Sequence, residues 1–119
     1  MQKNVLIEKS FSFAIDVVNC YKHLTDEKRE FIMRKQLLRS GTAIGALIRE
    51  AQNAESKADF IHKLAIAQKE CGETIYWIEL LKETDYLNDF RFNTLNNNGS
   101  VLLKMIRSAI LTTKQNHHS

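Results

Sequence analysis

Proline is absent from this 119-residue sequence, and glycine occurs only four times. These two residues form many of the tight turns in proteins, and an all-β fold needs such turns frequently. Proline is also the residue that breaks helices most strongly, so nothing in this chain must interrupt a helix. The two shortages therefore predict an all-α fold.

Long apolar runs and paired cysteines are also missing. No segment has the ~18 consecutive apolar residues of a membrane span, and no basic region followed by an apolar run opens the chain. We therefore expect a cytoplasmic protein. Cys20 and Cys71 are isolated in a chain long enough to bury its own core, which predicts reduced, packed thiols. The net charge of +3 permits contact with nucleic acid without requiring it.

Apolar spacing and capping residues predict four helices in a single domain that covers residues 1–119. The predicted helices are 8–23, 26–53, 57–84 and 89–113, followed by a frayed tail over 114–119. In the first helix, an apolar row has alternating spacings of four and three residues, which is typical of a buried face. The row consists of Ile7, Phe11, Ala14, Val18 and Tyr21.

Capping signals predict where the later helices begin. Thr25 is the predicted N-cap of the second helix, with acidic residues directly after it at the positive helix end. Ser56 and Asp59 form an S-x-x-D capping box for the third helix, and Asn88 is the predicted cap of the fourth. The second helix has its own inward row, made of Leu37, Gly41, Ile44, Ile48 and Ala51, with Phe31 and Leu38 beside it.

The third helix has an apolar row without interruption. Its members, at heptad spacing, are Phe60, Leu64, Ala67, Cys71, Thr74, Ile78 and Leu81. Such a repeat favours long helices packed side by side, and so predicts an up-and-down antiparallel four-helix bundle. The fourth helix continues the pattern with Leu95, Leu102, Ile106 and Ala109. Poor helix formers fill residues 96–100. The apolar spacing across them favours a continuous helix, and a break is the alternative.

The short link between the second and third helices predicts an antiparallel hairpin. If the turn centres near residues 54 and 55, the numbers of facing residues sum to about 109. This register pairs Arg39 with Glu70 and Arg49 with Asp59. Glu73 is a second candidate partner for an arginine, because a half-buried carboxylate needs one.

A second apolar face lies off the row of the third helix and consists of Ile66, Tyr76, Trp77 and Leu80. Such a face either widens the contact with a neighbouring helix or forms a surface between subunits. We favour self-association into a homo-oligomer.

Catalytic and cofactor-binding motifs are missing from the sequence. It has no G-x-S-x-G elbow and no glycine-rich phosphate loop. A di-iron site in a bundle needs two Glu-x-x-His motifs and two further glutamates. The nearest approximations here are Asp59-x-x-His62 and Glu70-x-x-Glu73. We therefore expect no enzymatic activity, no metal and no cofactor.

Two groups of basic residues are candidates for nucleic-acid contact. Lys28 and Lys35 share a face of the predicted second helix with Arg39, and Lys104, Arg107 and Lys114 share a face of the fourth. They are either ordinary solvated faces or patches that an oligomer sums into a surface able to neutralise several phosphates.

Several motifs resemble those of a known family. They are residues 36–51 (QLLRSGTAIGALIREA), 56–61 (SKADFI) and 65–81 (AIAQKECGETIYWIELL), supported by 8–14 (EKSFSFA) and 83–87 (ETDYL). They are similar to the bacterial four-helix bundle proteins, also called 23S rRNA-intervening sequence proteins. The sequence departs from the family pattern at Ala43, Leu47 and Gly72 and in the Asn-rich stretch, which puts a shared ligand site in doubt.

The resemblance implies an up-and-down bundle assembled into a homo-oligomeric ring, a pentamer. A related fold, the accessory protein of diversity-generating retroelements, implies nucleic acid or a ribonucleoprotein as partner. The leading hypothesis is thus a non-enzymatic oligomer that binds nucleic acid through its basic faces. The alternative is a protein-interaction module without a nucleic-acid role, which would use the face around Tyr76 and Trp77.

Overall fold

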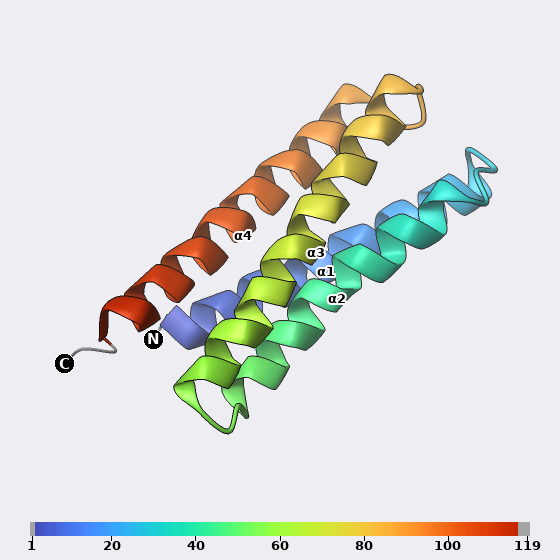
Figure 1. Ribbon diagram of the computed structural model, residues 1–119. Coiled ribbons are helices and arrows are strands. Elements are labelled where there is room, and N and C mark those ends of the chain that lie inside the picture. The colour runs from blue at the N-terminus through green and yellow to red at the C-terminus, as the bar shows by residue number, and fades with distance from the viewer. Residues whose placement is uncertain (1, 117–119) are drawn as a thin grey trace.

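Four helices make up the protein in the computed structural model, which describes residues 2–116. They are α1 (Gln2–Asp26), α2 (Met33–Gln52), α3 (Lys57–Glu83) and α4 (Asp89–Gln115). Consecutive helices run in opposite directions and form an elongated bundle of 52 × 22 × 20 Å (Figure 1). The predicted all-α bundle is confirmed. Its assembly into a ring stays a prediction.

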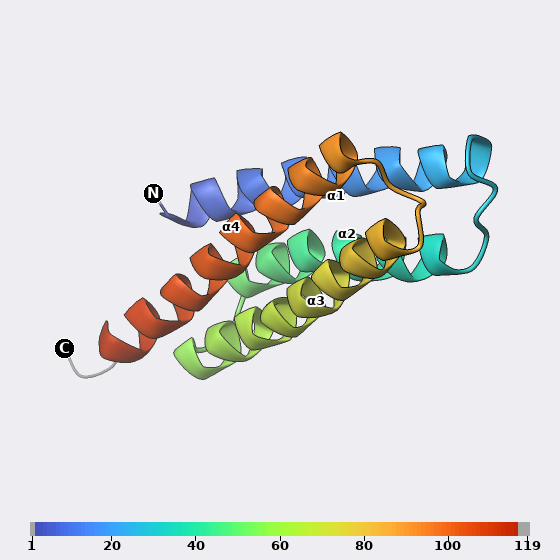
Figure 2. The ribbon, with the colours of Figure 1, turned by 90° about the horizontal axis from the view of Figure 1, so that it is seen from above.

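The bundle consists of two hairpins that cross each other. The α3–α4 hairpin lies across the α1–α2 hairpin at an angle (Figure 2). The contact between α2 and α3 is the most extensive one, and that between α1 and α4 is the least. The α1–α2 connection and the α3–α4 corner lie at one end, which we call the loop end. The α2–α3 turn lies at the other end, with the chain termini (Figure 1). No described helix has the length and apolar character needed to cross a membrane.

The core contains the predicted rows of α2 and α3. All of the predicted inward residues of α2 are buried, and so is the α3 row apart from Phe60, which is half-buried. In α4 the core positions are Leu95, Gly99, Leu102 and Ile106. The heptad spacing thus predicted these packed faces correctly, because each row contains few polar residues that could obscure it.

The predicted inward row of α1 is wrong by one residue. The buried positions are Leu6, Ser10, Phe13, Val17, Cys20 and Leu24, whereas Phe11 is 52% exposed. Both rows have the same four-three spacing, and the polar Ser10 disguised the correct one. Ser10 fits in the core because it packs against Gly45, where an added Cβ would lie only 3.4 Å from the Ser10 Oγ. Its hydroxyl donates to the Ile7 carbonyl at 3.1 Å.

The predicted start of the second helix at residue 26 is also wrong, because α1 continues to Asp26 and α2 begins at Met33. Thr25 lies inside α1 and donates to the Tyr21 carbonyl at 2.9 Å. Arg29 then adopts a left-handed conformation with φ of 55°, and the Glu30 N–H bonds the Leu24 carbonyl at 2.9 Å.

Glu30 caps α2 in place of Thr25. Its buried carboxylate accepts the backbone N–H groups of Ile32, Met33 and Arg34 at 3.0, 2.9 and 2.7 Å. Glutamate is not one of the usual N-cap residues, and for this reason the sequence did not reveal it.

Helix α1 begins at Gln2, six residues before the predicted start at residue 8, whereas the boundaries of α3 and α4 and the end of α2 lie within two residues of the prediction. The Ser56 Oγ accepts the Asp59 N–H at 3.0 Å, and the Asn88 Oδ1 accepts the Arg91 N–H at 2.8 Å. Helix α4 is continuous through residues 96–100, where the buried Gly99 lies against Phe13 and Ile75. Helix α4 extends to Gln115, so residues 114 and 115, which were predicted to belong to a frayed tail, are helical. Residues 117–119 lie outside the described residues.

The register between α2 and α3 differs from the predicted one by about a helical turn. Ser40 of α2 contacts Thr74 of α3, with 2.9 Å between their hydroxyl oxygens. Their residue numbers sum to 114, whereas the predicted register required a sum of about 109. The predicted pair Arg49–Asp59 is wrong, because these residues form no ion pair with each other and each has another partner. Arg49 lies over the Phe11 ring, 5.0 Å from its centroid, and Asp59 accepts the Glu55 N–H at 3.2 Å.

The Glu30 cap leads to a first prediction. We expect Glu30→Ala to lower the free energy of unfolding by about 1–2 kcal/mol, because three N–H groups at the start of α2 lose a charged acceptor. Urea denaturation followed by circular dichroism measures the change. Glu27→Ala is the matched control, since this exposed side chain should contribute less than about 0.5 kcal/mol. Equal effects of the two substitutions would refute the role of the cap.

Two glycines should respond to alanine with opposite signs. A Cβ at Gly41 would lie 2.8 and 2.9 Å from the Val17 methyl groups, whereas a Cβ at Gly72 would meet nothing within 4 Å. We expect Gly41→Ala to destabilise the protein by about 1–3 kcal/mol through overpacking. Gly72→Ala should stabilise it by roughly 0.5–1 kcal/mol through helix propensity. Thermal unfolding of both variants measures these changes in stability. A stabilising Gly41→Ala would contradict the packing argument.

Candidate binding surfaces

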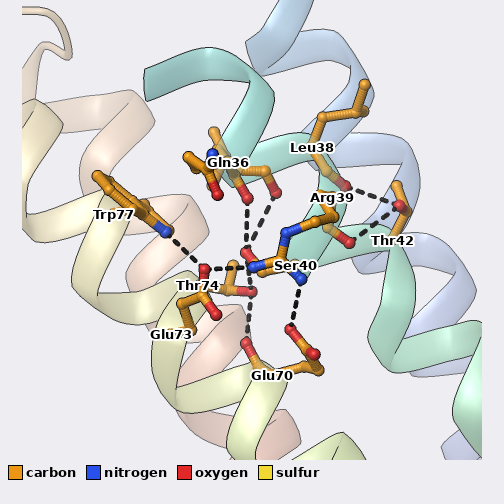
Figure 3. A network of polar contacts seen from close by, with 10 residues as sticks. Gln36, Leu38, Arg39, Ser40, Thr42, Glu70, Glu73, Thr74 and Trp77 are labelled. Carbon is orange, nitrogen blue, oxygen red and sulfur yellow. Dashed lines mark hydrogen bonds and ion pairs between the residues drawn. The ribbon is translucent and has the colours of Figure 1, made fainter. Parts of the chain in front are cut away.

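A polar network joins α2 and α3 on the surface of the bundle (Figure 3). The Arg39 guanidinium donates to Glu70 at 3.2 Å and also contacts Glu73. The Trp77 indole N–H donates to the same Glu73 carboxylate at 3.0 Å. The predicted Arg39–Glu70 pair is present, although the predicted register was wrong. The pair forms in spite of the shifted register because the long Arg39 side chain spans the offset between the two helices.

Hydrogen bonds set the electrostatics of this network. The indole N–H of Trp77 and then the Arg39 guanidinium lower the pKa of Glu73, because both stabilise its charged form. The Arg39 side chain is half exposed, so the ion pair is screened by solvent and contributes little to stability. The network orients Trp77. Its one cation, Arg39, is already paired with two carboxylates.

Two hydroxyl groups lie buried beneath this network. The Thr74 Oγ1 is 2.7 Å from the Glu70 carbonyl oxygen and 2.9 Å from the Ser40 Oγ, and Ser40 donates to the Gln36 carbonyl at 2.9 Å (Figure 3). Both side chains are fully buried. These hydroxyls therefore satisfy one another and the helix backbone, and their role is structural.

The second apolar face of α3 is less exposed than its sequence suggested. Tyr76 is 55% exposed, whereas Ile66, Trp77 and Leu80 are half-buried. Trp77 packs against the core and meets Tyr76 edge to face, with 5.1 Å between the ring centroids. Tyr76 is therefore the side chain of this face that offers most of its surface to a partner.

The five candidate cations for nucleic-acid contact are all exposed, but they lie in two places. Lys28 is in the α1–α2 connection, outside the helix in which it was predicted, and Lys35 is in the first turn of α2. Lys104, Arg107 and Lys114 are in the second half of α4, toward the opposite end of the bundle (Figure 1). A single copy of the chain therefore does not bring them together.

Sequence reasoning missed a cluster of rings and cations at the loop end. The Arg34 guanidinium lies 4.8 Å from the centroids of both the Tyr21 and Phe31 rings and contacts the Thr25 hydroxyl. The Nε of Arg34 is buried and has no hydrogen-bond partner among the described residues. Phe31 was predicted to lie beside the core, but it is 44% exposed in the connection. The misplaced start of α2 concealed this cluster.

The remaining reactive groups do not form a site. Within residues 2–116, no three acidic, histidine or cysteine side chains lie close enough to hold a metal ion. Both cysteines are unpaired and buried, and burial raises the pKa of each thiol to about 11. The Cys71 Sγ also lies 3.4 Å from the Gly99 carbonyl oxygen, to which the thiol donates. These thiols therefore stay protonated at neutral pH and act as small apolar core residues.

The Glu73–Trp77 hydrogen bond leads to a pH-dependent prediction. Because the pKa of Glu73 is lowered in the folded state, its contacts stabilise the protein above the unfolded pKa and lose this effect as the pH falls through the folded pKa. We expect Trp77→Phe to raise the Glu73 pKa, measurable by NMR titration of its carboxyl carbon. Tyr76→Phe, a change on the neighbouring exposed ring, should leave that pKa unchanged. An unaltered pKa in Trp77→Phe would contradict the assignment.

Comparisons with known proteins agree with this architecture. The family model described as 23S rRNA-intervening sequence protein matches residues 2–108. None of the curated proteins matches the chain. Among solved structures, the chain is similar to a protein of unknown function from the S23 ribosomal protein family of Bacteroides thetaiotaomicron. The two are 51% identical, with a TM-score of 0.90 over 92% of this chain and 98% of that one. The match over nearly all of the sequence shows that this chain belongs to the 23S rRNA-intervening sequence protein family.

Proposed function

We propose that this protein is a non-enzymatic, self-associating helical bundle that binds nucleic acid or a ribonucleoprotein through its basic faces. One observation carries the proposal. The exposed cations Lys28, Lys35, Lys104, Arg107 and Lys114 form no ion pair with any residue between 2 and 116, whereas Arg39, Lys63 and Lys82 are paired with carboxylates. Unpaired charges remain available to phosphates.

Self-association would make these charges effective. At physiological ionic strength, charges interact over about 8 Å, so the two basic groups at opposite ends of one 52 Å bundle act separately. Several copies in one assembly would repeat each group and add their phosphate contacts. The exposed ring of Tyr76 on the α3 face supports such an assembly. The family name refers to intervening sequences of 23S rRNA and makes RNA the first nucleic acid to test.

Salt dependence of RNA binding tests the proposal. We expect the logarithm of affinity to fall linearly with the logarithm of salt concentration, because bound cations release counterions. Lys104→Ala/Arg107→Ala should reduce the slope by about 1.4 on single strands, and Lys28→Ala/Lys35→Ala should do the same. The matched control Lys9→Ala/Lys69→Ala removes two exposed cations outside both groups. Fluorescence anisotropy at several salt concentrations measures the slopes.

Two results would overturn the proposal. One is the absence of RNA and DNA binding even at low salt. The other is an equal loss of slope in all three variants, which would indicate attraction by net charge alone. Light scattering coupled to size exclusion determines in the same samples whether the chain self-associates.

A protein-interaction module is the second candidate function, and the 55% exposure of Tyr76 favours it. In that case the face of Ile66, Tyr76, Trp77 and Leu80 would bind a different protein. Tyr76→Ala would then abolish capture of one defined partner, and nuclease treatment would leave the capture unchanged. Loss of self-association in Tyr76→Ala would instead assign this face to contacts between copies of the chain.

A further inference from the structure

The loop end of the bundle exposes more apolar surface than a solvated end requires. Phe90, in the first turn of α4, is 80% exposed, and Ile32, directly before α2, is 79% exposed. Phe31 beside it is 44% exposed. Two of the exposed aromatic rings of this protein therefore lie at the same end (Figure 1).

Cations lie close to the Phe31 ring. The Arg29 guanidinium lies 5.4 Å from the centroid of the Phe31 ring, and the Arg34 guanidinium lies 4.8 Å from it. Lys28 precedes Phe31 in the sequence and Lys35 follows it, and both lysine side chains are exposed. None of these four side chains forms an ion pair with a described residue. The charges therefore remain free for an anionic ligand.

Arg91 connects this cluster to Phe90. The Asn98 Nδ2 of α4 lies 3.5 Å from the Asp16 Oδ2 of α1, so residues of these two helices that face each other have numbers that sum to about 114. The same register along the antiparallel α1 and α4 places Arg91 opposite His23. Consistent with this, burial lowers the pKa of His23, and the charges of Arg91 and Lys28 lower it further. Arg91 and Lys28 thus approach the same imidazole from α4 and from the connection.

The connection holds its side chains in a defined arrangement. Buried Glu30 binds three backbone N–H groups, and the left-handed Arg29 permits the bond from the Glu30 N–H to the Leu24 carbonyl. A ligand would therefore meet an ordered surface, and little conformational entropy would be lost on binding.

Carboxylates limit where a polyanion can lie. Asp26 and Glu27 are exposed before the connection, and Glu83 and Asp85 are exposed at the end of α3. Asp89 points toward α3, where it pairs with Lys82 at 3.2 Å. The side of α4 that faces α1 carries Arg91 instead. Arg91 forms no ion pair with any residue between 2 and 116.

We infer that the ring-and-cation surface, defined as Lys28, Arg29, Phe31, Phe90 and Arg91, binds single-stranded RNA. Unpaired bases stack on the rings of Phe31 and Phe90, and the backbone phosphates lie against the three cations. Duplex RNA does not bind in this way, because its bases are already stacked and paired. This inference rests on the proposed function and specifies where and in which form the nucleic acid binds.

The test compares ring and charge variants on single-stranded RNA of about 12 nucleotides. We expect Phe31→Leu and Phe90→Leu each to weaken binding about fivefold or more, with an unchanged salt slope, because each loses stacking but no charge. Arg29→Asn/Arg91→Gln should instead reduce the salt slope by about 1.4. Asparagine tolerates the left-handed backbone at position 29. Phe11→Leu is the matched control, since Phe11 is a 52% exposed ring on α1, outside this surface.

Two further ligands separate stacking from charge. An abasic oligonucleotide of the same length should bind the unsubstituted protein more weakly than the RNA with bases does. Its affinity for the unsubstituted protein and for Phe90→Leu should be the same. Blunt duplex RNA should also be insensitive to Phe90→Leu. Since Phe90 is 80% exposed, its substitution should leave the melting temperature unchanged, and the test remains valid even if Phe31→Leu impairs folding.

Each outcome has a distinct meaning. Single-stranded RNA binding that is unaffected by Phe90→Leu, or equal affinity for the abasic strand, would overturn this inference and leave the proposed function intact. A protein that binds neither RNA nor DNA at low salt would overturn the proposed function itself.

Discussion

The close packing of α2 against its two neighbours is the constraint on which the rest of this structure depends. On one side, Gly41 lies so near Val17 of α1 that an added Cβ would be within 3 Å of its methyl groups. On the other side, the buried hydroxyls of Ser40 and Thr74 meet at 2.9 Å and set the register of α2 against α3. A slip of either helix would break the hydrogen bond between these two buried hydroxyls and leave each with only the backbone carbonyl of its own helix.

This register determines the chemistry of the surface. It brings Arg39 within reach of both Glu70 and Glu73, and Glu73 in turn orients the Trp77 indole. Arg39 is consequently paired within the hairpin. The unpaired candidate cations lie in the α1–α2 connection, in the first turn of α2 and on α4. The proposed binding function rests on this difference, because the unpaired cations remain available to a polyanion.

Sequence patterns predicted well where a single physical signal dominated. The α3 row is almost entirely apolar, and Ser56 and Asn88 are standard caps, so α3 and the start of α4 were identified correctly. Prediction failed where two signals competed. In α1, two rows share the same spacing, and polar Ser10 occupies the buried one. At the start of α2, Thr25 has the residue type of an N-cap, but the cap is Glu30, whose carboxylate becomes buried only when the connection folds.

The sequence by itself determined the number of helices, the faces of α2 and α3 that enter the core, and the family, because these depend on local propensity and periodicity. Only the tertiary structure decided the register between the helices and therefore which charges are paired. It also decided that the α1–α2 connection, which carries Phe31, and the first turn of α4, which carries Phe90 and Arg91, lie at the same end of the bundle. Periodicity within one helix carries no information about that arrangement.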